Sequence, residues 1–338
     1  MARSRRADEG GLRRALHGLV AILVCLAPLV GTGAEENAVA APIAPGAGVV
    51  PAGAGARLRA GIAAMEGGDA AHAARLFATV IDDHPIVADH AHRLWLKALR
   101  ELSHDATAAH LASGFELAYP DSPLRGEVFE LLGDARQALG ADAAARAAWQ
   151  RARREARNKE TRAALDLSIA ESFERSGRAW EASRTYLTVW TEAPTSEAAK
   201  TAEKALRRLE DRSGKSLRTP LQLAKRARAF YAARANQQAL ACYDRALDGS
   251  LPRDTRSELQ RGRAFTLFRL RRYPEAVVAF AKLGDGKQDR FWRARSLARS
   301  GRVAESIGEF EKLSKGRFTA LAARSLFLAG TLREDGAD

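Results

Sequence analysis

The sequence predicts an all-α protein, a right-handed superhelical solenoid of helical hairpins. One spacing returns along the chain: a small residue, then Gly, Ala, an aromatic residue and a small or aliphatic residue at offsets of 7, 12, 16 and 19. Its period near 35 residues is typical of stacked helical-hairpin arrays. The chain also lacks the alternating runs between turn dipeptides that predict strands. Its richness in Ala and Arg favours helix.

Each position of the repeat has a physical role. The clearest copy consists of Gly61, Gly68, Ala73, Phe77, Val80 and Pro85. The first small residue lets two helices approach closely, and the second Gly ends the first helix where a positive φ is required. The aromatic residue is expected to fill the gap to the next hairpin. The Pro closes the unit because it cannot continue a helix.

Carried along the chain, this register predicts seven hairpins and one extra helix. The hairpins span residues 57–85, 90–120, 127–153, 162–194, 221–247, 258–283 and 289–313. An inserted helix, 196–212, interrupts the period, and Ser103 stands in the Gly slot of the second hairpin. Residues 320–332 are expected to form the first helix of an unfinished hairpin, so the solenoid, 57–338, is expected to be truncated at its C-terminus.

The N-terminus has the parts of a secretory signal. Arg13 and Arg14 precede twelve apolar residues, Leu19–Val30, and small residues follow up to Ala34. This run is too short for a comfortable membrane span. We expect a signal peptide over 1–34, a flexible Ala/Pro/Gly tether over 35–56, periplasmic localisation and no membrane span after cleavage. Cleavage after Ala40 and an uncleaved anchor remain alternatives.

The charge and the cysteines limit the partners and the redox chemistry. The net charge of +13 could suit nucleic acid, but export separates the chain from nucleic acid, so we expect none bound. Only Cys242 remains after the signal is removed, and no internal disulfide can form. Cys242 is most simply a small packed residue.

A search for catalytic and metal-binding motifs finds nothing that carries chemistry. There is no Gly-rich phosphate loop, no Gly-x-Ser-x-Gly and no His-Glu-x-x-His. His90 and His92 are two residues apart, so on a helix they point to different faces. We therefore expect no metal, no cofactor and no catalytic residue in this chain.

The repeats resemble the tetratricopeptide repeat, and some segments resemble a narrower family. These segments are Tyr186–Trp190 with Pro194, the basic helix ending Leu206–Leu209, Leu221–Ala227 and Phe291–Arg302. They are similar to the helical superhelix of soluble lytic murein transglycosylases, over roughly residues 57–338. That family is exported, cleaves peptidoglycan glycan strands and carries a lysozyme-like catalytic domain after the superhelix.

The family's catalytic motifs are not found in this sequence. Glu171-Ser172-Phe173 is one residue short of the family's Glu-Ser-x-Phe, and no Gly-Leu-Met-Gln follows. The resemblance thus implies the non-catalytic portion of such an enzyme, which binds or orients peptidoglycan or the missing catalytic domain. The alternative is a free-standing periplasmic scaffold that binds envelope proteins. Whether the parent protein is an enzyme stays open, as does the oligomeric state.

The tetratricopeptide resemblance also implies a binding surface, a concave groove lined by first-helix positions. In this register those positions hold Arg228, Tyr231, Arg261, Phe265, Phe268, Arg269, Phe291, Arg295, Ala298 and Arg299. Arginine pairs bidentately with carboxylates, which peptidoglycan stem peptides carry, and aromatic side chains stack on sugars or peptides. The alternative is that these arginines are solvated surface charges.

Overall fold

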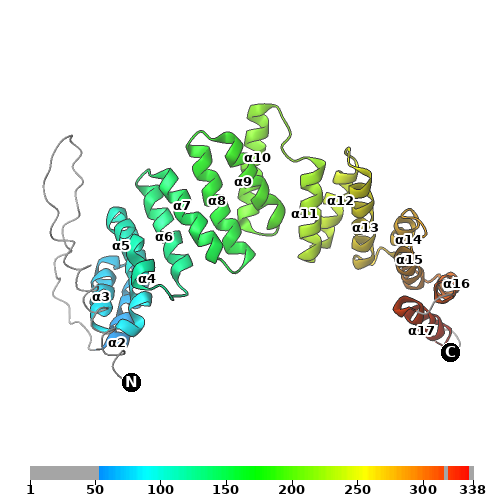
Figure 1. The fold of residues 1–338 in the computed structure, drawn as a ribbon, viewed down its shortest axis with the longest axis horizontal. Helices are drawn as coiled ribbons and strands as arrows, with labels where there is room; N and C mark the ends of the chain where they lie inside the picture. The colour runs from blue at the N-terminus through cyan, green and yellow to red at the C-terminus, as the bar shows by residue number, and fades with distance from the viewer. Residues whose placement is uncertain (1–52, 316–318, 335–338) are drawn as a thin grey trace, which may run out of the picture. The chain divides into compact units, whose positions relative to one another are not determined.

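The computed structural model describes residues 53–315 and 319–334, and every regular element in these ranges is helical (Figure 1). The expected signal peptide, and the tether up to residue 52, lie outside the described residues. The chain divides into two compact units, with the boundary after Glu155. The all-α prediction is confirmed: each unit is a helical solenoid of antiparallel hairpins.

Within its described residues, 53–155, the first unit contains three hairpins at the predicted places. They are α2 (Ala54–Glu66) with α3 (Ala70–Asp83), α4 (Ala88–Glu101) with α5 (Asp105–Ala118), and α6 (Arg125–Ala138) with α7 (Asp142–Glu155). A short 3-10 helix, Pro85–Val87, links the first two hairpins. Because α2 begins at Ala54, the last three residues of the expected tether are helical.

The described part of the second unit contains four hairpins and two single helices. They are α8 (Lys159–Arg175) with α9 (Ala179–Glu192), the inserted α10 (Glu197–Ser213), α11 (Pro220–Ala232) with α12 (Asn236–Leu247), α13 (Arg253–Arg269) with α14 (Tyr273–Ala281), α15 (Lys287–Arg299) with α16 (Val303–Ser314), and α17 (Ala320–Glu334). The inserted helix predicted over 196–212 is therefore confirmed. The last helix, α17, packs against α16.

A left-handed residue follows the first helix of every hairpin, two positions past its last helical residue. Four of these residues are the predicted glycines, Gly68, Gly140, Gly177 and Gly301, with φ of 80°, 74°, 71° and 83°. The other three are Ser103, Arg234 and Arg271, with φ of 58°, 60° and 60°. The repeat register thus dictates the backbone conformation even where the residue is not Gly, although the left-handed region is unfavourable for a side chain.

The first small residue of a repeat contacts the aromatic residue sixteen positions later. A Cβ on Gly61 would lie 2.4 Å from the Phe77 ring, and one on Gly133 would lie 2.4 Å from the Trp149 ring. The prediction that these helices need a small residue to approach is confirmed. The aromatic ring, however, packs first against its own hairpin, and not only across the gap to the next one as expected.

One buried arginine connects three helices around the inserted α10. Arg226 of α11 is 8% exposed and donates a hydrogen bond to the backbone carbonyl of Trp190 in α9. Its guanidinium lies over the rings of Trp190 and Phe230, 4.4 and 4.8 Å from their centroids. A carboxylate oxygen of Glu203 in α10 lies 3.5 Å from the same side chain. This cluster joins α9, α10 and α11 at the place where the inserted helix breaks the period.

Candidate functional site

The groups that could carry chemistry are separate from one another in the described residues. No cluster of three His, Cys, Asp or Glu side chains suited to a metal ion occurs among them. Glu171 lies on α8, the first helix of its hairpin, and partial burial raises the pKa of its carboxyl. Cys242 is a buried free thiol whose pKa is also raised by burial, as expected for a packed residue.

The first helices α11, α13 and α15 hold all ten residues of the predicted groove, and we call this surface the arginine wall. Neighbouring first helices are in contact: α11 meets α13, and Phe265 of α13 stacks edge to face on Trp292 of α15 at 5.1 Å. The repeat spacing brings these side chains to one surface because equivalent positions of successive first helices face the same way.

Two arginines of the wall are already paired with carboxylates. Arg261 donates two hydrogen bonds to Asp289 at 2.9 Å each, and this interaction raises the pKa of Arg261. Arg228 donates to Glu258 at 2.6 Å. These ion pairs bridge successive hairpins and leave little uncompensated charge for a partner.

A third arginine of the wall is engaged by an aromatic side chain. The Arg269 guanidinium lies 3.6 Å from the centroid of the Tyr231 ring and donates to the Tyr231 backbone carbonyl at 2.8 Å. Its charge is not neutralised, because neither contact supplies an acid. Arg269 therefore lies over the Tyr231 ring and keeps its positive charge.

The structure corrects the roles of two predicted aromatic residues. Phe291 is only 2% exposed and packs edge to face against Phe310, so it belongs to the core and is not available to a partner. Phe265 is half-buried and lies against Phe280 and Trp292. Both rings support the wall from behind, because these first-helix positions turn inward toward the second helices.

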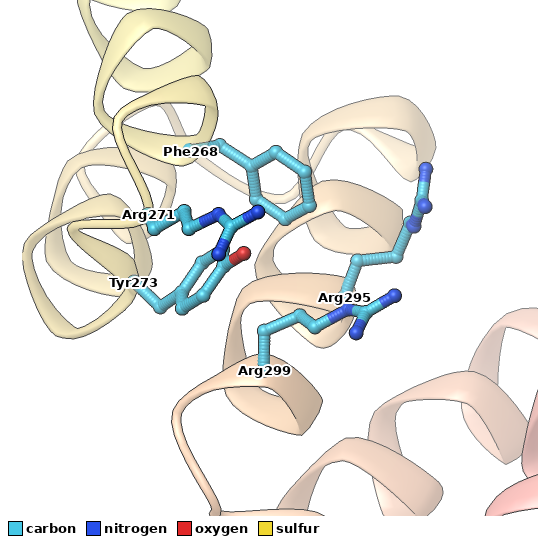
Figure 2. Close-up of a pocket in the computed structure, with 5 residues that line it drawn as sticks. All are labelled: Phe268, Arg271, Tyr273, Arg295 and Arg299. Atoms are coloured by element: carbon cyan, nitrogen blue, oxygen red, sulfur yellow. The ribbon is translucent and has the colours of Figure 1, made fainter.

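Three more of the predicted residues, Phe268, Arg295 and Arg299, line a pocket at the α14 end of the wall. Its volume is about 440 Å³, and its lining consists of Phe268, Arg271, Tyr273, Arg295 and Arg299. Figure 2 shows Arg271 and Tyr273 on one side of the pocket and Arg295 and Arg299, from α15, on the other. The rings of Phe268 and Tyr273 meet at 5.4 Å between centroids.

The pocket has an excess of positive charge. None of its three arginines forms an ion pair among residues 53–315 and 319–334, and no acidic side chain lines it. Burial, followed by the nearby charges of Arg324 and Arg299, lowers the pKa of Arg295. The Arg295 guanidinium lies 4.6 Å from the Trp292 ring centroid and 5.5 Å from that of Phe268. Like charges held this close favour an anion.

The groove prediction missed two lining residues, Arg271 and Tyr273, because it considered only first-helix positions. Arg271 is the left-handed residue after α13, and Tyr273 is the first residue of α14. The repeat register could have predicted the position of Arg271. It follows Ala264 by seven residues, the same offset that separates Gly68 from Gly61. That offset places its side chain at the hairpin turn, beside the end of the wall.

The whole second unit is more basic than the first. Basic residues clearly outnumber acidic ones from residue 156 onward, whereas acidic residues slightly outnumber basic ones between residues 53 and 155. The excess charge of the protein therefore resides in the unit that carries the pocket. Within the described ranges, no helix has the length and apolarity needed to cross a membrane.

Comparison with known proteins adds only a likeness of fold. The chain matches no protein-family model and no curated protein. Among solved structures it is similar to a tetratricopeptide repeat protein from Parabacteroides merdae, with 12% identity, a TM-score of 0.38, and coverage of 82% of this chain and 98% of that chain. It is also similar to the TPR2AB domain of yeast Sti1 in complex with pHSP90, with 16% identity, a TM-score of 0.32, and coverage of 78% and 98%.

Proposed function

We propose that this protein is a non-catalytic binding scaffold whose arginine wall takes an acidic polypeptide segment of a partner. The observation that carries the proposal is the pocket at the end of the wall, where three arginines that have no acidic partner in the described part of the chain adjoin the half-buried rings of Phe268 and Tyr273. Carboxylates satisfy unpaired guanidinium groups bidentately, and the half-buried rings beside them supply apolar contact. An array of stacked hairpins offers such a surface without requiring any chemistry.

The narrower hypothesis is that the carboxylates belong to peptidoglycan stem peptides. Two expectations support it: the resemblance of the repeats to lytic murein transglycosylases and the predicted export of the chain. In this version the protein binds or orients peptidoglycan, or a catalytic domain, as the non-catalytic portion of such an enzyme. N-terminal sequencing of the protein made in a Gram-negative host tests the export step, with a start near Glu35 expected.

Binding of poly-glutamate, measured by fluorescence anisotropy, tests the scaffold proposal, and sedimentation with purified sacculi tests the peptidoglycan version. We expect the double reversal Arg295→Glu with Arg299→Glu to abolish poly-glutamate binding. Binding by the unmodified protein should weaken between about 50 and 200 mM salt, because exposed charges are screened over this range.

The matched control is Arg234→Glu with Arg245→Glu, which changes the net charge equally at two exposed arginines of the α11–α12 hairpin. This control should retain most of the binding. Equal loss in both double variants would mean that poly-glutamate responds only to total charge, which would refute the proposal. If the Arg295→Glu with Arg299→Glu variant no longer binds poly-glutamate but still sediments with sacculi, the wall does not bind sacculi through their carboxylates. That result would refute the peptidoglycan version.

A further inference from the structure

We propose that the pocket formed by Phe268, Arg271, Tyr273, Arg295 and Arg299 is a phosphoryl-binding site, which takes a phosphate ester carried on a ring or another apolar group. The inference deepens the proposed function, on which it rests, because it names the chemical group by which the partner is anchored. It goes beyond a general affinity for carboxylates. The site is expected to select its ligand by two properties, the negative charge of the ligand and its shape.

The charge of the pocket calls for more than one negative charge. Arg271, Arg295 and Arg299 line it from two sides without an acidic partner among the described residues. A carboxylate would neutralise only one of them, whereas a phosphomonoester carries nearly two charges near neutral pH and three acceptor oxygens. The repulsion of Arg295 by Arg299 and Arg324 is relieved more completely by the dianion.

The hydrogen-bonding groups fit the same ligand. Guanidinium groups offer several N–H donors in a planar arrangement that suits phosphate oxygens. The Tyr273 hydroxyl adds a donor on the same side as Arg271, and no hydrogen bond within the described protein uses it. The pocket therefore presents donors to a tetrahedral group from two opposite sides.

The size and the walls of the pocket indicate that the phosphoryl group is attached to something larger. A volume of about 440 Å³ exceeds what a single inorganic anion fills. The half-buried rings of Phe268 and Tyr273 line part of that space, and Trp292 lies behind Arg295. These rings provide apolar area for the group that carries the phosphate.

Three small probes separate the two requirements when they are titrated by calorimetry at low salt. Phenyl phosphate has a ring and two charges, inorganic phosphate has the charge without the ring, and benzoate has the ring with one charge. We expect phenyl phosphate to bind most tightly, with benzoate at least about tenfold weaker, since each charge-assisted hydrogen bond lost has about this effect. Benzoate binding as tightly as phenyl phosphate would overturn the proposal. Inorganic phosphate binding equally well would remove the ring requirement and show a site for the free anion.

The hairpin turns supply a matched pair of variants. Arg271→Gly and Arg234→Gly each remove an exposed arginine from a left-handed position, so each should fold and melt no lower than the unmodified protein. Only Arg271→Gly should weaken phenyl phosphate, by about tenfold. Equal weakening in both variants, or none in Arg271→Gly, would refute the site.

The outcomes also distinguish this inference from the proposed function. If phenyl phosphate binds as expected but poly-glutamate does not bind, the pocket stands and the scaffold for acidic polypeptides fails. If poly-glutamate binds through Arg295 and Arg299 but phenyl phosphate shows no preference over benzoate, the wall stands and the phosphoryl site fails.

Discussion

His92 should make the first unit unstable in mild acid. The side chain is 9% exposed on α4, and its ring lies against those of Phe115, Tyr119 and Trp95, with centroids 5.4, 5.8 and 6.0 Å away. Its Nε2 atom is buried without a hydrogen-bond partner. Burial alone lowers the pKa of His92 from 6.5 to about 4, because the charged imidazolium would lose its hydration.

The sign and the size of the effect follow from the two pKa values. Between pH 6.5 and about 4 the unfolded chain binds a proton at His92 and the folded chain does not, so folding stability falls as the pH falls. The contribution is fully present above pH 6.5 and is lost by about pH 4. A shift of this size corresponds to about 3 kcal/mol, since one pKa unit equals about 1.4 kcal/mol.

Urea unfolding followed by circular dichroism at several pH values from 4 to 7 measures this dependence. Other titrating groups add their own slope, so the quantity of interest is the difference between the unmodified protein and His92→Leu. Between pH 7 and pH 4, His92→Leu should lose about 3 kcal/mol less free energy of unfolding than the unmodified protein. His90→Gln, two residues away on the exposed side of the same helix, is the control and should keep the full slope. An NMR titration that places the His92 pKa near 6.5, or equal slopes in His92→Leu and the unmodified protein, would refute the reasoning.

Three further substitutions test the packing of the solenoid. Gly133→Val forces a side chain into the Trp149 ring, where even a Cβ would lie 2.4 Å away, and should lower the free energy of unfolding by about 1–3 kcal/mol or more; unchanged denaturant midpoints would show that the helices can separate freely. Arg226→Ala removes the guanidinium that joins α9, α10 and α11 and should cost about 3 kcal/mol, with hydrogen exchange expected to rise first in α10. Arg261→Met leaves the buried Asp289 without these two hydrogen bonds and should cost about 2 kcal/mol, seen as a lower denaturant midpoint. An unchanged midpoint would contradict this expectation.

The repeat register determined by itself the hairpins, their order and their turns. It placed the inserted helix between the fourth and fifth hairpins, and its Gly slot predicted the left-handed residues at Gly68 and Gly140. These features can be predicted from the sequence because each depends on residues within one repeat of about 35 positions. The offsets between these residues are set by the helix period and the length of the hairpin turn, so they recur in every repeat. The same register places Arg271 at the position that Gly occupies in other repeats, and Arg271 has the same left-handed conformation.

Only the tertiary structure decided which side chains of the wall are available to a partner. Arg261 is neutralised by Asp289, which is 28 residues away, and Phe291 turns into the core against Phe310. Composition and spacing treat all arginines of the wall alike, because a side chain's rotamer and its ion-pair partner depend on distances between successive hairpins. The pocket beside Arg295 exists for the same reason: it forms where the turn before α14 approaches α15, and its lining, among the described residues, contains no acidic side chain.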